Sequence, residues 1–297
     1  MRFIACFILI WSMVAFAFMS GESENFSIDE GFDQITCGTN SSDVSWRIRG
    51  QKNAGNRFAI MLNGSPVTQY FGDESFQSAR LVDELIKQGY KVLEVKYSGS
   101  GGFYSLCFMQ GLENVSNHCA SLYDLAVDKL GFDAANPDHK LVGVGWSIGA
   151  VQLQAMSFMH GKRIDNIALT GILLGNAEKG CQSYREDEND GYSWKFFHDL
   201  AAALTTNGNG CDEPSEFSAA YNFENLAYFK DWNLGLFEGT EIDEGGNIPH
   251  AQYIADIRRA AHAPVKLFAY DNCGHELFEC TEGKVVSDML DFLVADY

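Results

Sequence analysis

The sequence predicts one α/β domain with a mostly parallel central sheet that is flanked by helices. The chain has 297 residues, of which 46% are hydrophobic, so it is long enough to bury one sizeable core. Short apolar runs alternate with amphipathic helical patterns of about a dozen residues, as in proteins built from strand–helix–strand crossovers. One strand-to-helix junction near the middle of the chain carries a serine between glycines.

The N-terminus has the pattern of a cleaved export signal. An almost wholly apolar run over residues 3–16 follows a single arginine, and small residues precede a cleavage position after about Ala17. The run is too short to predict a membrane span. We therefore expect a signal peptide over residues 1–17 and a secreted protein, extracellular or periplasmic, without stable membrane insertion. The polar, acidic stretch 18–43 predicts an exposed N-terminal leader, and residues 44–297 form the predicted domain.

The first half of the domain contains three predicted strands and two predicted helices. Residues Val44–Arg49 alternate apolar and polar, the pattern of an edge strand, whereas the continuous apolar run Phe58–Leu62 predicts a strand that is buried on both faces. Apolar residues three and four apart predict helices over Glu74–Gln88 and Asn117–Leu130, each followed by a glycine. The third predicted strand, Lys91–Tyr97, lies between these helices.

The second half repeats the alternation with one long interruption. Lys140–Trp146 is a predicted strand that leads directly into a helix, and Asn166–Gly175 is the next apolar run. Residues from about 176 to 232 break the pattern, since they are rich in aromatic and acidic residues, and the length of this stretch predicts an inserted cap. The alternation then resumes with predicted strands over Asn233–Gly239 and Val265–Asp271 and predicted helices over Ala251–Ala261 and Lys284–Val294.

The glycine-flanked serine belongs to Gly145-Trp146-Ser147-Ile148-Gly149, a G-x-S-x-G motif. At a strand-to-helix junction, such a motif lifts the serine into a strained, exposed position and brings neighbouring backbone very close. Residues two before and two after the serine must then be nearly free of side-chain atoms. We therefore predict Ser147 as a nucleophile, and the alternative is a structural serine in a glycine-rich turn.

The order of elements and this motif resemble the α/β-hydrolase superfamily over roughly residues 45–295. Residues 62–66, Leu-Asn-Gly-Ser-Pro, stand where that family often has His-Gly-x-Pro, with asparagine in place of the histidine. Residues 97–102 resemble its glycine-rich loop, and the Gly-His-Glu segment at 274–276 resembles the loop before its final helix. The resemblance implies the α/β-hydrolase fold, with the cap inserted after the sixth strand of that fold.

The resemblance also implies where a negatively charged oxygen would be stabilised. In the family, the loop after the early strand and the residue after the nucleophile each supply a backbone N–H to an oxyanion hole. By position, these N–H groups would belong to Ser65 and Ile148.

The general base that Ser147 would need is predicted at His275. A serine hydroxyl is a poor nucleophile near neutral pH, and imidazole titrates in the range that a base requires. Of the seven histidines, only His275 follows a predicted core strand in a glycine-containing loop, where the loops of a parallel sheet converge. His198 and His250 are the reserve candidates.

The acid that would orient His275 is expected in the loop of residues 239–244, after the preceding strand. Asp243 is the first candidate and Glu241 is the second. The family's usual Gly-x-x-Asp spacing would place Ile242 at this position, so the sequence leaves the acid open. The weaker candidates are Glu238 and Asp271.

Eight cysteines, seven of them after the predicted signal peptide, indicate disulfides in an exported protein. No C-x-x-C pair is present, which disfavours a zinc site or a thioredoxin-like redox centre. Three local bridges follow the order of the cysteines in the sequence and leave Cys37 unpaired: Cys107–Cys119, Cys181–Cys211 and Cys273–Cys280.

Together these observations predict a secreted serine hydrolase of the lipase/esterase type, which cleaves carboxylic esters through an acyl-enzyme with a Ser-His-Asp triad. We expect a small-molecule or lipid-like ester as substrate and no metal or organic cofactor. The formal charge of −19 argues against nucleic-acid partners. Two alternatives stay open: a non-catalytic, hydrolase-like secreted binding protein, and a peptidase or acyltransferase with the same triad.

Overall fold

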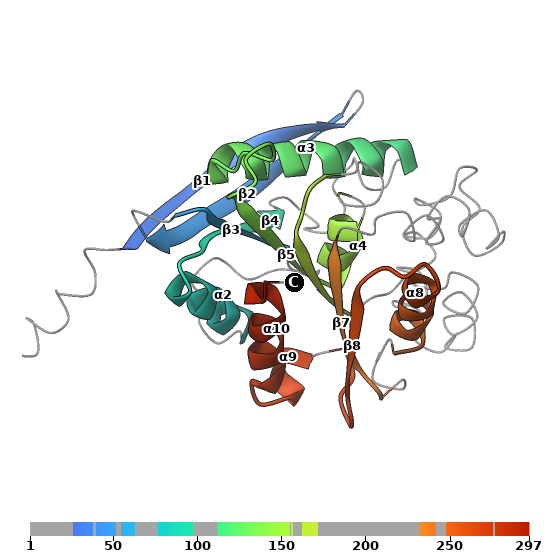
Figure 1. Cartoon of the computed structure of the whole chain (residues 1–297). Coiled ribbons are helices and arrows are strands. Elements are labelled where there is room, and N and C mark those ends of the chain that lie inside the picture. The colour runs from blue at the N-terminus through green and yellow to red at the C-terminus, as the bar shows by residue number, and fades with distance from the viewer. Residues whose placement is uncertain are drawn as a thin grey trace, which may run out of the picture.

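In the computed structural model, a mostly parallel sheet runs through the molecule with helices on both of its faces (Figure 1). The structure describes residues 26–37, 40–51, 55–62, 77–97, 112–154, 156, 162–171, 232–241, 248–275 and 277–296. In spatial order, the strands are β1 (Phe26–Cys37), β2 (Asn40–Gln51), β4 (Lys91–Tyr97), β3 (Arg57–Leu62), β5 (Lys140–Trp146), β6 (Asn166–Thr170), β7 (Asn233–Gly239) and β8 (Val265–Tyr270). The helices are α2 (Gln77–Lys87), α3 (Leu112–Leu130), α4 (Ile148–Gln154), α8 (Ile248–Ala260), α9 (Leu277–Cys280) and α10 (Lys284–Val294).

The sheet buries a separate apolar core on each face, because side chains alternate between the faces along every strand. In β5, Leu141 belongs to the core that α3, α4 and α8 cover, and Val142 belongs to the core that α2 and α10 cover. With helices on both faces, β3 and β6 are buried almost throughout, which explains their continuous apolar sequences. Each fully buried leucine, isoleucine or valine contributes about 1.5–3 kcal/mol to the free energy of folding.

The N-terminal hairpin corrects two expectations from the sequence. β1 pairs antiparallel with β2 along its whole length, so residues 26–37 and 40–43, the larger part of the expected leader 18–43, belong to the sheet. Because β1 lies outside β2, the expected edge strand Val44–Arg49 is an inner strand that also pairs with β4. One face of β1 remains open to solvent, and Ile28 and Phe32 are 68% and 76% exposed there.

The other face of the hairpin shows why its polar residues form a strand. The indole N–H of Trp46 donates to a carboxylate oxygen of Asp33 at 2.6 Å, and Lys129 of α3 forms an ion pair with the same oxygen at 3.0 Å. Gly31 leaves room for the Trp46 ring, since a Cβ atom there would lie 2.5 Å from it. The glycine and acidic residues that suggest a solvated leader therefore serve the packing of α3 against the hairpin.

The other expected elements in the described part are found with small shifts. β4, β7 and α10 have the expected bounds, α3 begins at Leu112, and the short helix α9 has no counterpart among the predictions. The expected signal peptide, residues 1–17, and the expected cap up to residue 231 lie outside the described residues. Among the residues that the structure describes, no helix is long and apolar enough to cross a membrane.

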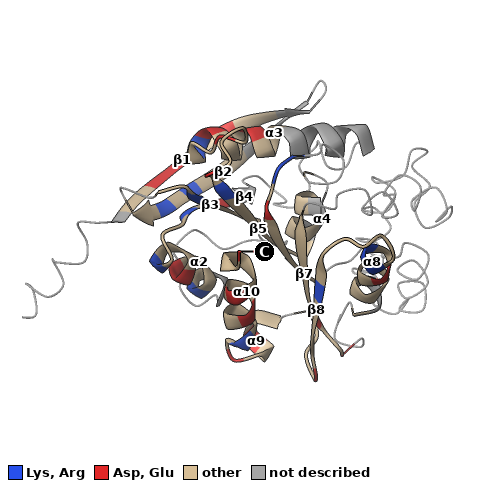
Figure 2. Cartoon of the chain, viewed as in Figure 1, with Lys and Arg blue, Asp and Glu red and all other residues tan. Residues whose placement is uncertain are grey.

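Charged residues gather on the outer helices and on the hairpin side of the sheet. Figure 2 shows acidic and basic residues interspersed along α2, α8 and α10, where ion pairs such as Lys284–Asp288 join residues one turn apart at 2.8 Å. Among the described residues, three charged side chains are buried: Glu94, Glu238 and Arg258. Glu94 of β4 accepts hydrogen bonds from Arg47 and Arg49 of β2 at 2.9 Å each. The strands at the centre of the sheet stay apolar.

Candidate active site

Ser147 occupies the turn between β5 and α4 in a strained backbone conformation. Its φ angle is 55°, in the left-handed region that non-glycine residues rarely adopt. The Ser147 N–H donates to the carbonyl of Thr170 at 2.9 Å, and the Ser147 carbonyl accepts from the N–H of Ala150 at 3.0 Å. Only 7% of Ser147 is exposed, less than the motif predicts, because the turn is packed against the end of β6.

Gly145 shows the close approach that the motif requires. A Cβ atom at this position would lie 2.7 Å from both the Cα of Ala150 and the carbonyl oxygen of Gly149. Both of these atoms are backbone, so they cannot rotate away as a side chain could. The first turn of α4 can therefore fold back over β5 only if residue 145 is glycine.

His275 lies beside Ser147, although the two residues are far apart in the sequence. A Cβ atom on Gly171, the residue after β6, would lie 2.6 Å from Cε1 and 3.0 Å from Nδ1 of His275, and 3.3 Å from the Ser147 nitrogen. The imidazole and the backbone of the serine thus share one small space, which Gly171 keeps open. The Trp146 ring flanks the imidazole, with ring centroids 5.8 Å apart. The predicted nucleophile and the predicted base therefore lie close together at the edge of the sheet where the parallel strands end.

Burial lowers the pKa of His275 from its ordinary value of 6.5 to about 4, because a buried imidazolium loses its hydration. The ring is therefore neutral at pH 7 and can accept a proton. In the described part of the chain, no carboxylate forms an ion pair with this ring.

The loop after β7, where the acid is expected, lies against the histidine loop. The N–H of Glu241 donates to the carbonyl of Cys273 at 2.9 Å, and the N–H of Thr240 donates to the carbonyl of Tyr270 at 3.1 Å. A Cβ atom on Gly239 would collide with the carbonyl group of Cys273, so the two loops touch through their backbones. Of the two candidate acids, Glu241 is described and makes no ion pair with His275, whereas Asp243 lies outside the described residues.

Of the two expected oxyanion donors, Ile148 lies in the described part of the chain and Ser65 lies outside it. Ile148 is the first residue of α4, directly after the serine. The first N–H groups of a helix have no partner within the helix, and the role of the Ile148 N–H in an oxyanion hole stays a prediction. Ser65 and the reserve candidate His198 lie outside the described residues, and His250, the other reserve candidate, belongs to α8.

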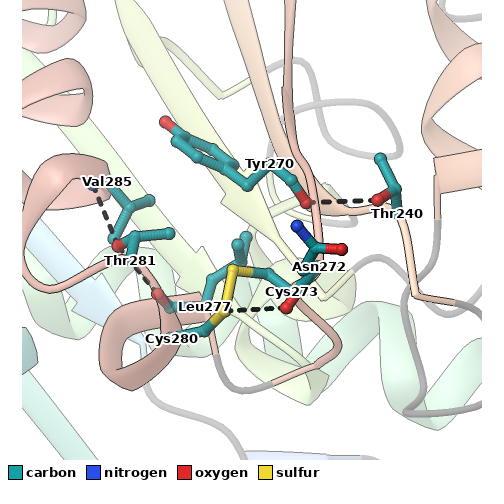
Figure 3. The surroundings of a disulfide bond; sticks show 8 residues. All are labelled: Thr240, Tyr270, Asn272, Cys273, Leu277, Cys280, Thr281 and Val285. Atoms are coloured by element: carbon teal, nitrogen blue, oxygen red, sulfur yellow. Dashed lines mark hydrogen bonds between the residues drawn. A yellow bond between two sulfur atoms is a disulfide. The ribbon is translucent and has the colours of Figure 1, made fainter.

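The predicted bridge between Cys273 and Cys280 is present and encloses the histidine loop (Figure 3). It joins the residue two before His275 to the last residue of α9, with the two Cα atoms 5.6 Å apart. The Thr281 hydroxyl donates to the carbonyl of Leu277 and accepts from the N–H of Val285, which joins α9 to α10. The other two predicted bridges rest on side chains outside the described residues.

Sequence reasoning missed the residues that bring the serine and the histidine together. Trp146 ends β5 and pairs with Thr170 at the end of β6, Gly171 follows Thr170, and the carbonyl of Thr170 accepts from the serine N–H. These contacts depend on the spatial order of β5, β6, β7 and β8, which the sequence does not state. Among the described residues, no group of three or more histidine, cysteine or acidic side chains could hold a metal ion.

No protein-family model matches the sequence, and no curated protein matches it. Solved structures, by contrast, resemble it. A thermostable carboxyl esterase from Bacillus coagulans has a TM-score of 0.54 and 12% identity, over 90% of this chain and 99% of its own. The esterase Pf2001 from Pyrococcus furiosus has a TM-score of 0.53 and 17% identity, over 90% of each chain. Epoxide hydrolase A from Mycobacterium thermoresistibile has a TM-score of 0.52 and 14% identity, over 89% of this chain and 98% of its own.

Proposed function

Because the chain has the α/β-hydrolase fold, we propose that it is a secreted serine hydrolase that cleaves carboxylic esters. One observation carries the proposal: the imidazole of His275 and the backbone of Ser147 meet at Gly171, with Ser147 held at φ 55°. A strained serine beside a neutral, partly buried imidazole is the arrangement that nucleophilic catalysis needs.

In the proposed reaction, Ser147 Oγ attacks the acyl carbon while His275 takes the hydroxyl proton. The alcohol leaves with that proton, an acyl-enzyme remains on Ser147, and a water molecule then releases the acid by the reverse sequence. The lowered pKa of His275 keeps the imidazole neutral at pH 7, so the base is available without prior deprotonation. The N–H groups of Ile148 and Ser65 would stabilise the oxyanion.

Asp243 is the acid that we propose to orient His275. The hydrogen bond from the Glu241 N–H to the Cys273 carbonyl supports this loop as the source of the acid, because it joins Glu241, two residues before Asp243, to the histidine loop. Glu241 itself makes no ion pair with His275 among the described contacts, which favours Asp243 over the second candidate. A carboxylate at this position would hold the imidazole and stabilise the imidazolium that forms during the reaction.

Small-molecule or lipid-like esters are the proposed substrates, and the location is extracellular or periplasmic. The resemblance to two esterase structures supports the ester class, although the fold also occurs in an epoxide hydrolase and does not by itself decide the chemistry. The apolar N-terminal run and the disulfide beside His275 support export, because disulfides persist in oxidising compartments.

The test is covalent labelling of the purified mature protein with a fluorophosphonate, followed by mapping of the labelled peptide. We expect one adduct, on Ser147, and none in the Ser147→Ala variant. Labelled protein then justifies a series of esters of increasing acyl length, with peptide substrates as the comparison. A folded protein that is not labelled between pH 5 and 9 would overturn the proposal and leave a non-catalytic binding protein as the alternative.

A further inference from the structure

The loop that carries His275 is closed covalently. Cys273 and Cys280 are seven positions apart, so their bridge encloses the histidine within a short ring of chain. α9, at the far end of this ring, is fixed by Leu277 and Phe278, which are 1% and 5% exposed in the apolar core. The bridge therefore ties the histidine loop to a helix that is anchored in the apolar core.

Cys273 is also the residue that the acid-bearing loop contacts. Its carbonyl accepts the hydrogen bond from the Glu241 N–H at 2.9 Å, and Gly239 passes so close to the carbonyl groups of Cys273 and Gly274 that no side chain fits between them. One buried residue, 4% exposed, thus holds α9 through its sulfur and the loop after β7 through its carbonyl.

We propose that the Cys273–Cys280 bridge is a positioning element that holds His275 in register with both Ser147 and the loop after β7, so that reduction by a dithiol switches off the hydrolase. The inference rests on the proposed function. Catalytic groups must be held within about half an ångström of their productive positions, and a glycine-containing loop without its cross-link samples a far wider range. His275 would then leave the space beside Gly171, although the sheet beneath it remains intact.

The chemistry of the switch is thiol–disulfide exchange. Cys280 is exposed, whereas Cys273 is buried, so one thiolate of the dithiol attacks the sulfur of Cys280. The bond between the two protein sulfurs breaks, and Cys273 leaves as a thiolate that takes up a proton. The second thiol of the reagent then displaces Cys280 and closes a cyclic disulfide. The protein gains two electrons and two protons, and the reagent loses the same number.

The experiment compares the rate at which the fluorophosphonate labels Ser147 in four samples of the full mature chain. These are the native protein, the protein treated with dithiothreitol, the Cys273→Ser/Cys280→Ser double variant and an exposed control on α9, Glu279→Gln. We expect labelling at least tenfold slower in the reduced protein and in the double variant, and unchanged in the control. Reoxidation should restore the labelling rate of the reduced protein, and dithiothreitol should not change the labelling rate of the double variant.

Two additional measurements separate positioning from loss of structure and from the other cysteines. Circular dichroism checks that the slowly labelled samples stay folded. The labelling rate is also measured as a function of pH, because a displaced imidazole changes the apparent pKa on the acidic side of that profile. In a partial reduction series, alkylation and mass spectrometry give the fraction of molecules in which the Cys273–Cys280 bridge is open. The labelling rate should fall in proportion to that fraction. This series keeps the test valid if the double variant does not fold.

The outcomes distinguish this inference from the function on which it rests. Native protein that is never labelled overturns the proposed function. Native protein that is labelled at Ser147, together with a folded double variant labelled at the same rate, overturns the inference alone. Two further outcomes also overturn the inference: dithiothreitol still slows the labelling of the double variant, or the labelling rate does not follow the opening of the Cys273–Cys280 bridge. In either case another disulfide is responsible.

Discussion

The carbonyl of Cys273 accepts a hydrogen bond from the backbone N–H of Glu241 at 2.9 Å, and this contact joins the end of β8 to the end of β7. The loops after these two strands carry the proposed base and the proposed acid. Their backbones touch directly, since Gly239 leaves no space for a side chain against Cys273. The described parts of the two loops are therefore held together by backbone contacts and not by long, flexible side chains.

Replacing Gly171 by alanine should abolish labelling of Ser147 with a limited loss of stability. The new Cβ would lie 2.6 Å from Cε1 of His275 and push the imidazole away from the serine. The φ angle of 63° adds a backbone cost of about 1–2 kcal/mol for a residue with a side chain. Gly131→Ala is the matched control, because Gly131 has a similar φ of 73° and nothing within 4 Å of the added Cβ. Equal labelling of both variants would contradict the placement of His275.

Replacing Gly145 by alanine should destabilise the turn that presents Ser147. The added Cβ would meet two backbone atoms at 2.7 Å, and overpacking against groups that cannot rotate costs about 3 kcal/mol. We expect that loss in urea unfolding, together with slower labelling. Gly55→Ala serves as the control, since an added Cβ there has no neighbour within 4 Å. A Gly145→Ala variant as stable as the control would mean that β5 and α4 do not approach as described.

The stability of the protein should fall between pH 6.5 and pH 4 through His275. Burial holds the pKa of this imidazole near 4, below its ordinary value of 6.5. Above pH 6.5 both the folded and the unfolded states carry the neutral ring, so His275 contributes no pH dependence there. Below pH 6.5 the unfolded chain takes up the proton first, and the free energy of unfolding falls by about 2–3 kcal/mol by pH 4.5.

The measurement is urea unfolding of the native protein and of His275→Gln at pH 7 and pH 4.5. All other titrating groups are common to both proteins, so the difference between their pH effects reports His275. The variant should lose about 2–3 kcal/mol less than the native protein on acidification. An equal loss in both would show that His275 is solvated in solution.

Removing the guanidinium of Arg258 should cost far more stability than removing that of its neighbour. Arg258 is fully buried and donates to the carbonyls of Trp232 and Pro264 at 2.6 and 3.0 Å, which anchors the chain where it enters β7 and β8. Arg258→Met would leave both carbonyls without this donor, and we expect a loss of about 3 kcal/mol. Arg259→Met is the control, because Arg259 is half exposed and, among the described residues, pairs with Asp256 on the surface. Thermal unfolding of both variants measures the difference, and similar midpoints would contradict the anchoring role.

The central strands and the local disulfide could be predicted because their signals are contained in short stretches of sequence. The apolar run Phe58–Leu62 has the composition of a doubly covered strand, and the helix Lys284–Val294 keeps one strict periodicity from end to end. Cys273 and Cys280 are close in the chain, so sequence order sufficed to pair them. In each case, the neighbours that decide the structure are near in sequence.

The hairpin and the inner contacts of the site could not be predicted, because they depend on partners distant in sequence. β1 is a strand because of Trp46 and Lys129, and without them Asp33 resembles a residue of a solvated leader. Gly171 leaves no room for a side chain because His275, 104 residues later, folds back onto it. Its sequence neighbours give no sign of that contact.

The outermost strand also bears on how the protein behaves in concentrated solution. β1 ends the sheet in the described part of the chain and exposes Ile28 and Phe32, so its outer edge could recruit a strand from another molecule. Asp29 and Glu30 lie on the same strand, and two copies aligned edge to edge would bring these like charges together. Electrostatic repulsion would then oppose association of two copies through this edge. Since salt screens such repulsion, association through this edge should become more favourable as ionic strength rises.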